Sequence, residues 1–243
     1  MVLNQKLNIN TKLSKLILGT TGFFKKGLIP FCMIFQLIED LIFPDPALAE
    51  EDGLLAVGGD LSVPRLLLAY ENGIFPWFTE EEPIMWYSPP QRFVLYPTEV
   101  KISKSMRQVL NSERFTLTYN QAFSDVIAEC AMAKRKGQNG TWINLDMISA
   151  YNELHRQGFA HSIEIWENEE LVGGLYGVLL GDVFCGESMF SKKSNASKTA
   201  LIWLCQNVQL SLIDCQVYTE HLESMGARLI SRQAFLDHLR NNH

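Results

Sequence analysis

The sequence predicts an α+β fold in two parts: a small N-terminal domain over residues 33–92 and a larger C-terminal domain over residues 93–243 with a mixed sheet. Three observations lead to this prediction. The 243 residues suffice for one large domain or two small ones. Apolar residues make up 47% of the chain and charged residues 20%, which is a globular composition. Proline and glycine are dense from Phe43 to Pro90, whereas helix-like and strand-like patterns alternate after Arg92.

Residues 1–32 differ from the rest of the chain, because they contain lysines but no acidic residue. We expect an extension that is either a disordered tail or upstream sequence translated from a start earlier than Met33. Lys25 and Lys26 interrupt its apolar stretch, and no A-x-A site follows, which argues against a secretory signal peptide.

One helix is predicted in the small N-terminal domain, over residues 65–72. Asp60 and Ser62 are suitable caps, Pro64 fits a first helical turn, and Gly73 fits the position after the last turn. The remainder of this domain is expected to consist of short elements and turns.

The larger domain reads as an alternation of helices and strands. Helices are expected over residues 103–110, 123–133, 145–157, 195–209, 221–225 and 232–240. Strands are expected over residues 93–96, 115–119, 160–167, 171–180, 183–188 and 212–217. The strands between residues 160 and 188 form a meander that leads into a helix and then another strand. This order is typical of the core of the N-acetyltransferase-like fold.

The composition also excludes several classes of protein. A formal net charge of −6 argues against a protein that coats nucleic acid, so any contact with RNA must come from small local patches. No apolar run reaches the roughly 18 to 20 residues of a membrane-spanning helix, so no membrane partner is expected. Five scattered cysteines without a C-x-x-C pair argue against a metal site and indicate reduced thiols in a cytoplasmic protein.

Three polar side chains are candidates for chemistry. Glu187 lies in the apolar segment of residues 184–190, where it either forms a structural ion pair or receives a cationic group. Asp214 and Gln216 alternate along a predicted strand, so both side chains would share one face. A carboxylate beside an amide can orient a proton donor or an amine, although many strands alternate in this way.

Two further clusters have both a structural and a functional interpretation. Five aromatic residues gather within a short stretch: Phe75, Trp77, Phe78, Trp86 and Tyr87. They build a core or, less commonly, stack on an unpaired base. Four basic residues follow: Arg92, Lys101, Lys104 and Arg107. They form a solvated surface or contact the phosphates of an RNA backbone.

Several short motifs follow one another along the chain. They are Gly53–Ser62 (GLLAVGGDLS), Ala69–Tyr70 (AY), Gly73–Phe78 (GIFPWF), Trp86–Pro89 (WYSP), Gly140–Ile143 (GTWI), His161–Glu164 (HSIE), Leu171–Gly177 (LVGGLYG), Gly186–Ser191 (GESMFS), Ala196–Lys198 (ASK) and Ile213–Gln216 (IDCQ). In this order they closely resemble the leucyl/phenylalanyl-tRNA–protein transferases of bacteria, from Met33 to about Leu239. Each motif is weak alone, but the ordered set is highly specific.

The resemblance implies an activity, partners and roles for residues. It implies a C-terminal N-acetyltransferase-like domain that transfers Leu or Phe, and also Met, from aminoacyl-tRNA to proteins that begin with Arg or Lys, marking them for degradation. No cofactor and no metal are implied, and we expect a monomer. The implied catalytic residues are Asp214, Gln216 and Glu187. The implied wall of the aminoacyl side-chain pocket consists of Phe184, Met189, Ile213 and Tyr151. Trp77 and Trp142 would hold the terminal adenosine of the tRNA.

Two other functions remain open from the sequence. A tRNA-dependent ligase of the cell-wall bridge type has a similar fold, but such enzymes usually carry two copies of it and are longer. A non-catalytic protein that binds tRNA ends or N-degron peptides would need no catalytic residues, and the joint presence of Glu187, Asp214 and Gln216 argues against it.

Overall fold

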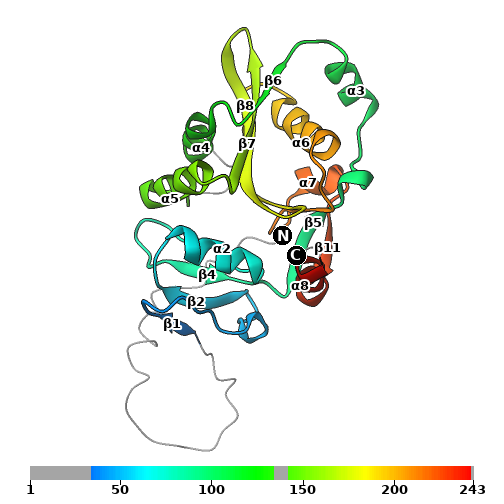
Figure 1. Cartoon of the computed structure of the whole chain (residues 1–243). Helices are drawn as coiled ribbons and strands as arrows, with labels where there is room; N and C mark the ends of the chain where they lie inside the picture. Colours follow the sequence, from blue (N-terminus) through cyan, green and yellow to red (C-terminus); the bar gives the residue numbers. More distant parts are fainter. Residues whose placement is uncertain (1–33, 134–141, 242–243) are drawn as a thin grey trace, which may run out of the picture.

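A computed structural model describes residues 34–133 and 142–241. The extension predicted over residues 1–32 lies outside the described residues. Two sheets organise the chain, a four-stranded one near the N-terminus and a seven-stranded one that occupies the larger part of the molecule (Figure 1). None of the helices in the described ranges is long and apolar enough to span a membrane.

The four-stranded sheet has the strand order β1-β2-β4-β3. Its strands are β1 (Phe35–Leu37), β2 (Leu54–Gly58), β3 (Phe75–Pro76) and β4 (Met85–Tyr87). β1 is parallel to β2, whereas the β2–β4 and β3–β4 pairs are antiparallel. The sequence pattern predicts none of these strands, since no strand of this sheet exceeds five residues, which is too short for a period to show.

The helix predicted in this part is confirmed as α2 (Val63–Glu71). Pro64 lies in its first turn, and Gly73 follows it with a φ of +67°, a left-handed conformation that glycine adopts without strain. α2 buries Leu66 and Tyr70 against the core. Its Arg65 is also fully buried, and it donates to the Asp60 carboxylate from Nε at 3.1 Å.

The seven-stranded sheet has the order β11-β5-β10-β9-β8-β7-β6. Its strands are β5 (Gln91–Leu95), β6 (Thr116–Tyr119), β7 (Ala160–Glu167), β8 (Glu170–Leu180), β9 (Val183–Ser191), β10 (Leu212–Asp214) and β11 (Arg228–Ser231). β6 to β9 form an antiparallel meander, and β10 is parallel to β9 but antiparallel to β5. The predicted α+β class with a mixed sheet is therefore confirmed. The predicted domain boundary at Arg92 falls inside β5.

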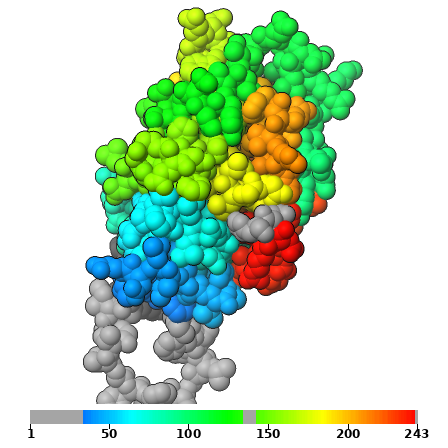
Figure 2. Space-filling model, in the orientation of Figure 1, coloured from blue at the N-terminus to red at the C-terminus, as the bar shows by residue number. Residues whose placement is uncertain are grey.

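Helices cover both faces of this sheet (Figure 1). They are α3 (Lys104–Leu110), α4 (Phe123–Met132), α5 (Leu145–Arg156), α6 (Ala196–Asn207), α7 (Glu220–Ser224) and α8 (Arg232–Asn241). Two short 3₁₀ turns also occur, η1 (Pro46–Leu48) before β2 and η2 (Pro97–Glu99) before α3. α4 and α5 pack on one face in a core that they share with α2, β2 and β4. α6 packs on the opposite face in a second core. Figure 2 shows the N-terminal part, in blue and cyan, packed directly against the green helices of the larger part.

A β-bulge interrupts the pairing of β8 with β9. Tyr176 pairs with Ser188, but the next residue, Gly177, pairs with Gly186, so Glu187 is an extra residue on β9. Strand alternation would otherwise place Phe184 and Met189, five positions apart, on opposite faces. Because of the bulge, both side chains lie against the core that α6 covers.

The strand predicted over residues 212–217 is shorter in the structure, because β10 ends at Asp214. Gln216 has a φ of +60°, which is outside the conformations of a strand. The prediction that alternation along one strand brings Asp214 and Gln216 together is therefore wrong. A turn brings them together instead, in which the Asp214 Oδ1 accepts a hydrogen bond from the backbone N–H of Gln216 at 2.8 Å.

Candidate active site

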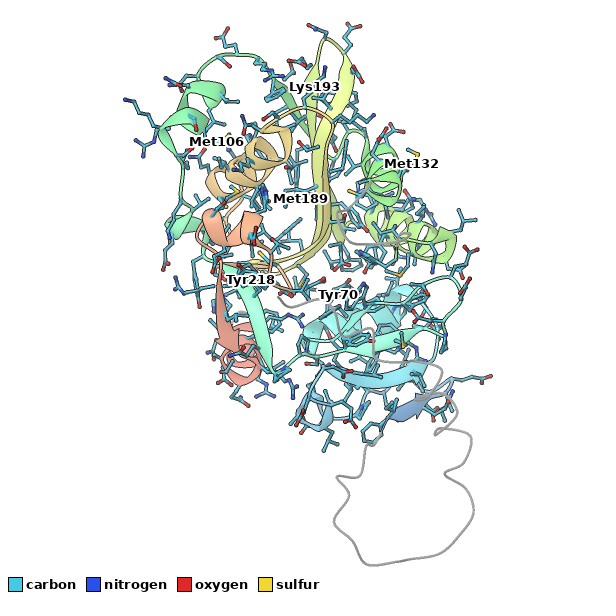
Figure 3. All side chains as sticks on the ribbon, turned by 180° about the vertical axis from the view of Figure 1, so that it is seen from behind. Tyr70, Met106, Met132, Met189, Lys193 and Tyr218 are labelled. Carbon is cyan, nitrogen blue, oxygen red and sulfur yellow. The ribbon has the colours of Figure 1, made fainter. Side chains whose placement is uncertain are left out.

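A cavity of about 340 Å³ lies where β9 and β10 part, bounded by both parts of the chain. This volume is within the range of small-molecule sites. Apolar side chains form much of its wall: Leu175, Phe184, Met189, Leu201, Leu204, Ile213 and Leu222. Met189 lies on the side of the large sheet that α6 covers (Figure 3). Phe184, Met189 and Ile213, three of the four residues predicted for the side-chain pocket, line this one cavity.

The polar part of the wall includes the three predicted catalytic residues, Glu187, Asp214 and Gln216. Glu187 is 8% exposed, and its two carboxylate oxygens have different partners. Oε1 accepts from the Gln216 side-chain amide at 2.6 Å, and Oε2 accepts from the Tyr151 hydroxyl at 2.9 Å. No cationic side chain among the described residues forms an ion pair with Glu187, whose partners are a hydroxyl and an amide, so the structural ion-pair interpretation is not supported.

Asp214 is held by a buried arginine. The Arg92 guanidinium donates to both oxygens of this carboxylate, with Nε at 2.9 Å from Oδ1 and Nη2 at 2.8 Å from Oδ2. Its Nη1 also donates to the backbone carbonyl of Gly73 at 3.2 Å. The rings of Phe75 and Phe235 flank the guanidinium, each with its centroid 4.6 Å from the central carbon.

Arg92 therefore does not fit its predicted role in binding the tRNA backbone, and that prediction is wrong. Its side chain is 2% exposed, and its donors are directed at Asp214 and Gly73. The other three basic residues of the predicted set, Lys101, Lys104 and Arg107, are exposed. Lys101 lines a second cavity of about 300 Å³ together with Lys198 from the first turn of α6.

Tyr151 also departs from its predicted role as a wall of the side-chain pocket. It is fully buried and is not among the residues that line the cavity. Its hydroxyl lies behind Glu187, where it donates to Oε2 and forms a short hydrogen bond with the hydroxyl of Tyr70. Tyr151 thus supports the carboxylate and does not contact the occupant of the cavity.

Burial raises the pKa of Glu187 to about 7. The hydroxyl groups of Tyr70 and Tyr151 and the side-chain amide of Gln216 oppose this rise, whereas the negative charge of Asp214 adds to it. A carboxyl group with a pKa near neutrality can both accept and release a proton at physiological pH. Perturbed carboxyl groups of this kind are common at catalytic sites.

The two predicted adenosine-binding aromatics, Trp77 and Trp142, both line the cavity and are half-buried. Trp77 follows β3, and its ring lies edge-on to Tyr87 with the centroids 5.7 Å apart. Trp142 precedes α5. The four-stranded sheet and the larger part of the chain each contribute one tryptophan to the same cavity, a placement that no spacing in the sequence predicts.

The described residues offer no group of three or more His, Cys, Asp or Glu side chains that could hold a metal ion. The thiols of Cys185 and Cys215 are also poor nucleophiles. Burial raises the pKa of Cys185 well above its usual value, and burial likewise raises the pKa of Cys215. The site therefore combines an apolar wall, a buried carboxyl group and an amide, without an activated thiol among the described residues.

Comparison with known proteins identifies one family. The family described as leucyl/phenylalanyl-tRNA protein transferase matches residues 94–240, and its N-terminal domain matches residues 59–90. A leucyl/phenylalanyl-tRNA–protein transferase of Flavobacterium johnsoniae is 56% identical over 86% of this chain and 100% of the relative. The corresponding protein of Syntrophobacter fumaroxidans is 58% identical over 86% of this chain and 91% of the relative.

The chain belongs to the leucyl/phenylalanyl-tRNA–protein transferase family. The family predicted from the ordered motifs is thereby confirmed. Likeness to solved structures is weaker: a GCN5-related N-acetyltransferase from Kribbella flavida has a TM-score of 0.37 and 8% identity, over 67% of this chain and 58% of that chain.

The Arg92–Asp214 pair makes a prediction about stability. We expect Arg92→Met to lower the free energy of unfolding by about 3–5 kcal/mol, because it leaves the Asp214 carboxylate buried without its counter-charge. Denaturant unfolding measures this change. Arg114→Met is the matched control: Arg114 is 39% exposed and pairs with Glu167 at 2.6 Å, so about 0–1 kcal/mol is expected. An equal loss in both variants would contradict the structural role of Arg92.

Proposed function

We propose that this protein transfers Leu, Phe or Met from aminoacyl-tRNA to the α-amino group of proteins that begin with Arg or Lys. The observation that carries the proposal is the cavity, which combines an apolar wall, the Glu187–Gln216 pair and two tryptophans. Membership of the transferase family supports the reaction class.

The apolar wall suits the side chain of the transferred amino acid. Phe184, Met189 and Ile213 are the predicted contacts, and Leu201, Leu204 and Leu222 extend the same surface. One methylene group distinguishes ligands by only about 1–3 kcal/mol in such a pocket, so Leu, Phe and Met are expected to share it. A charged side chain would lose its hydration there without gaining a partner, which would exclude it.

The reaction requires positioning and the movement of one proton. The aminoacyl ester is already activated, so the neutral α-amine of the acceptor can attack its carbonyl carbon directly. A C–N bond forms, the ester C–O bond breaks, and the ribose oxygen leaves with a proton while the amine loses one. Glu187 lines the cavity and is suited to accept the proton of the amine, and Gln216, held by Asp214, is suited to orient that amine.

Trp77 and Trp142 are proposed to hold the terminal adenosine of the tRNA. Stacking of a base on an aromatic ring contributes about 1–3 kcal/mol per base and does not require a paired strand. A free tRNA end offers such an unpaired base. Both rings line the cavity that contains Glu187, so a stacked adenosine would bring the ester linkage toward this carboxyl group.

Lys101, Lys104 and Arg107 are proposed to contact the tRNA backbone. All three are exposed, and they lie at or just before α3. Lys101 and Lys198 both line the second cavity. Helix α7 lies between the two cavities, because its His221 and Leu222 line the first cavity and its Ser224 lines the second. A few local contacts are consistent with the net charge of −6, which also suits acceptors with a cationic first residue. We further propose that the protein acts as a monomer in the cytoplasm.

A transfer assay tests the reaction. The protein is incubated with labelled Leu-tRNA and one of two peptides that differ only in their first residue, Arg or Ala. We expect label on the Arg peptide and little on the Ala peptide. No transfer to the Arg peptide would overturn the proposal, and binding of the tRNA without transfer would favour a non-catalytic binder of tRNA ends.

Gln216 provides a test of the positioning role. We expect Gln216→Ala to lower turnover about 100-fold or more, because the attacking amine loses its orientation and Glu187 loses a hydrogen bond at Oε1. The dissociation constant for aminoacyl-tRNA should change little, as measured by filter binding. Gln157→Ala, at the exposed end of α5, is the matched control and should retain turnover. Equal losses of turnover and tRNA binding would contradict the positioning role.

The basic residues predict a dependence on salt. Each phosphate contact contributes about 0.7–0.9 to the slope of log affinity against log salt concentration. We therefore expect Lys104→Ala to reduce this slope by that amount in tRNA binding measured between low and moderate salt. Arg240→Ala removes a similar charge on α8, 69% exposed, and should leave the slope unchanged. Identical slopes for the wild type and Lys104→Ala would count against the backbone contact.

A further inference from the structure

Tyr70 connects the N-terminal part of the chain with the proposed catalytic carboxyl group. It lies on α2, is 1% exposed and reaches the hydroxyl of Tyr151 on α5. Tyr151 in turn donates to Glu187 Oε2 at 2.9 Å. Figure 3 shows Tyr70 on α2, across from Met189 and the large sheet. Two buried hydroxyl groups thus lead from α2 to the wall of the cavity.

The hydrogen bonds in this chain have one direction. A tyrosine hydroxyl has a single proton to donate. Because Tyr151 donates its proton to Glu187, it accepts from Tyr70, and both donors point toward the carboxylate. Burial raises the pKa of Tyr70 and the pKa of Tyr151 well above the usual value, so both hydroxyl groups stay protonated over the physiological range.

The groups around Glu187 act in opposite directions. Three neutral groups stabilise the ionised carboxylate. Tyr151 from α5 and Gln216 after β10 donate hydrogen bonds to it, and Tyr70 from α2 donates to Tyr151. Asp214 from β10 destabilises it by its negative charge, and the thiol of Cys185 on β9 lies nearby. Arg92 neutralises Asp214 by a bidentate contact. The two tyrosines therefore stabilise the carboxylate at Oε2, and Gln216 stabilises it at Oε1.

We propose that Tyr70, acting through Tyr151, is a positioning residue that holds the Glu187 carboxylate ionised and oriented toward the cavity. The role rests on the transfer reaction proposed above, in which Glu187 accepts a proton from the acceptor amine. The N-terminal part of the chain would then contribute to the site in two ways. It supplies Trp77, and through Tyr70 on α2 it sets the pH range over which Glu187 accepts a proton.

Tyr70→Phe tests this role with little change in packing, since the ring stays in the core and one hydroxyl is removed. Loss of a stabilising donor should raise the pKa of Glu187, which is about 7, by about one pH unit. Since the ionised form is the proton acceptor, activity falls as pH falls through this value. The acid limb of the kcat/KM profile should therefore move upward by about one unit, and activity below it should drop about tenfold.

Carbon-13 NMR titration of the glutamate carboxyl groups measures the same quantity in the free protein, with Glu187→Gln assigning the signal by its loss. Tyr151→Phe removes the direct donor and should shift the midpoint in the same direction. Tyr119→Phe is the matched control: its hydroxyl bonds His161 Nδ1 at 2.9 Å, away from Glu187, so the midpoint should stay in place. Thermal unfolding shows whether each variant is folded.

The outcomes separate this role from the transfer reaction. A raised midpoint in Tyr70→Phe and Tyr151→Phe, but not in Tyr119→Phe, supports the role. An unchanged midpoint in a folded Tyr70→Phe variant overturns the role. If Tyr70→Phe does not fold, an unchanged midpoint in Tyr151→Phe overturns it instead. The titration needs no substrate, so absence of transfer in the wild type would count against the reaction alone.

Discussion

The buried ion pair between Arg92 and Asp214 is the interaction on which the site depends. It joins β5 to β10, and through the Gly73 carbonyl and the Phe75 ring it also fixes the segment between α2 and β3. A buried ion pair contributes little net stability compared with well-packed apolar residues, so its presence is better explained by the geometry that it imposes. With Asp214 fixed, Oδ1 accepts from the N–H of Gln216, and this contact holds the turn that aims the Gln216 amide at Glu187.

The bulge at Glu187 is the second constraint, and it acts on the shape of the cavity. It turns Phe184 and Met189 to the same face, while Cys185 and Phe190 remain in the opposite core. Gly177 makes room for it, since a Cβ there would lie 2.3 Å from the Cys185 carbonyl oxygen and 2.7 Å from the Phe184 ring. The same irregularity that places the acid at the cavity thus also assembles the apolar wall beside it.

Much of the larger domain could be predicted because its elements carry strong periodic signals. β7 carries the alternating Ile163 and Ile165, β8 is a long apolar run, and Asn168 and Glu169 adopt positive φ in the turn between the two strands. The strands before β5 could not be predicted in the same way, since two to five residues are too few for a period to show. In the site, the residue types of Glu187, Asp214 and Gln216 were enough to predict that they are candidates for chemistry. The burial of Arg92 and Tyr151 could not be predicted, because it depends on packing between segments more than 80 positions apart. Tyr70 belongs to one of the motifs that carry the resemblance, but no local pattern predicts its contact with Tyr151, 81 positions away.

Burial without a cationic partner explains the perturbed acidity of Glu187. Its carboxyl group is buried in the cavity wall, which disfavours the charged form, and the negative charge of Asp214 in the same wall adds to the effect. Arg92 supplies a counter-charge to Asp214 alone, by a bidentate contact. Glu187 receives neutral donors instead, the Gln216 amide and the Tyr151 hydroxyl, which stabilise a carboxylate less than a guanidinium does. The pKa of Glu187 therefore lies near neutrality, and its carboxyl group is able to exchange a proton with an amine.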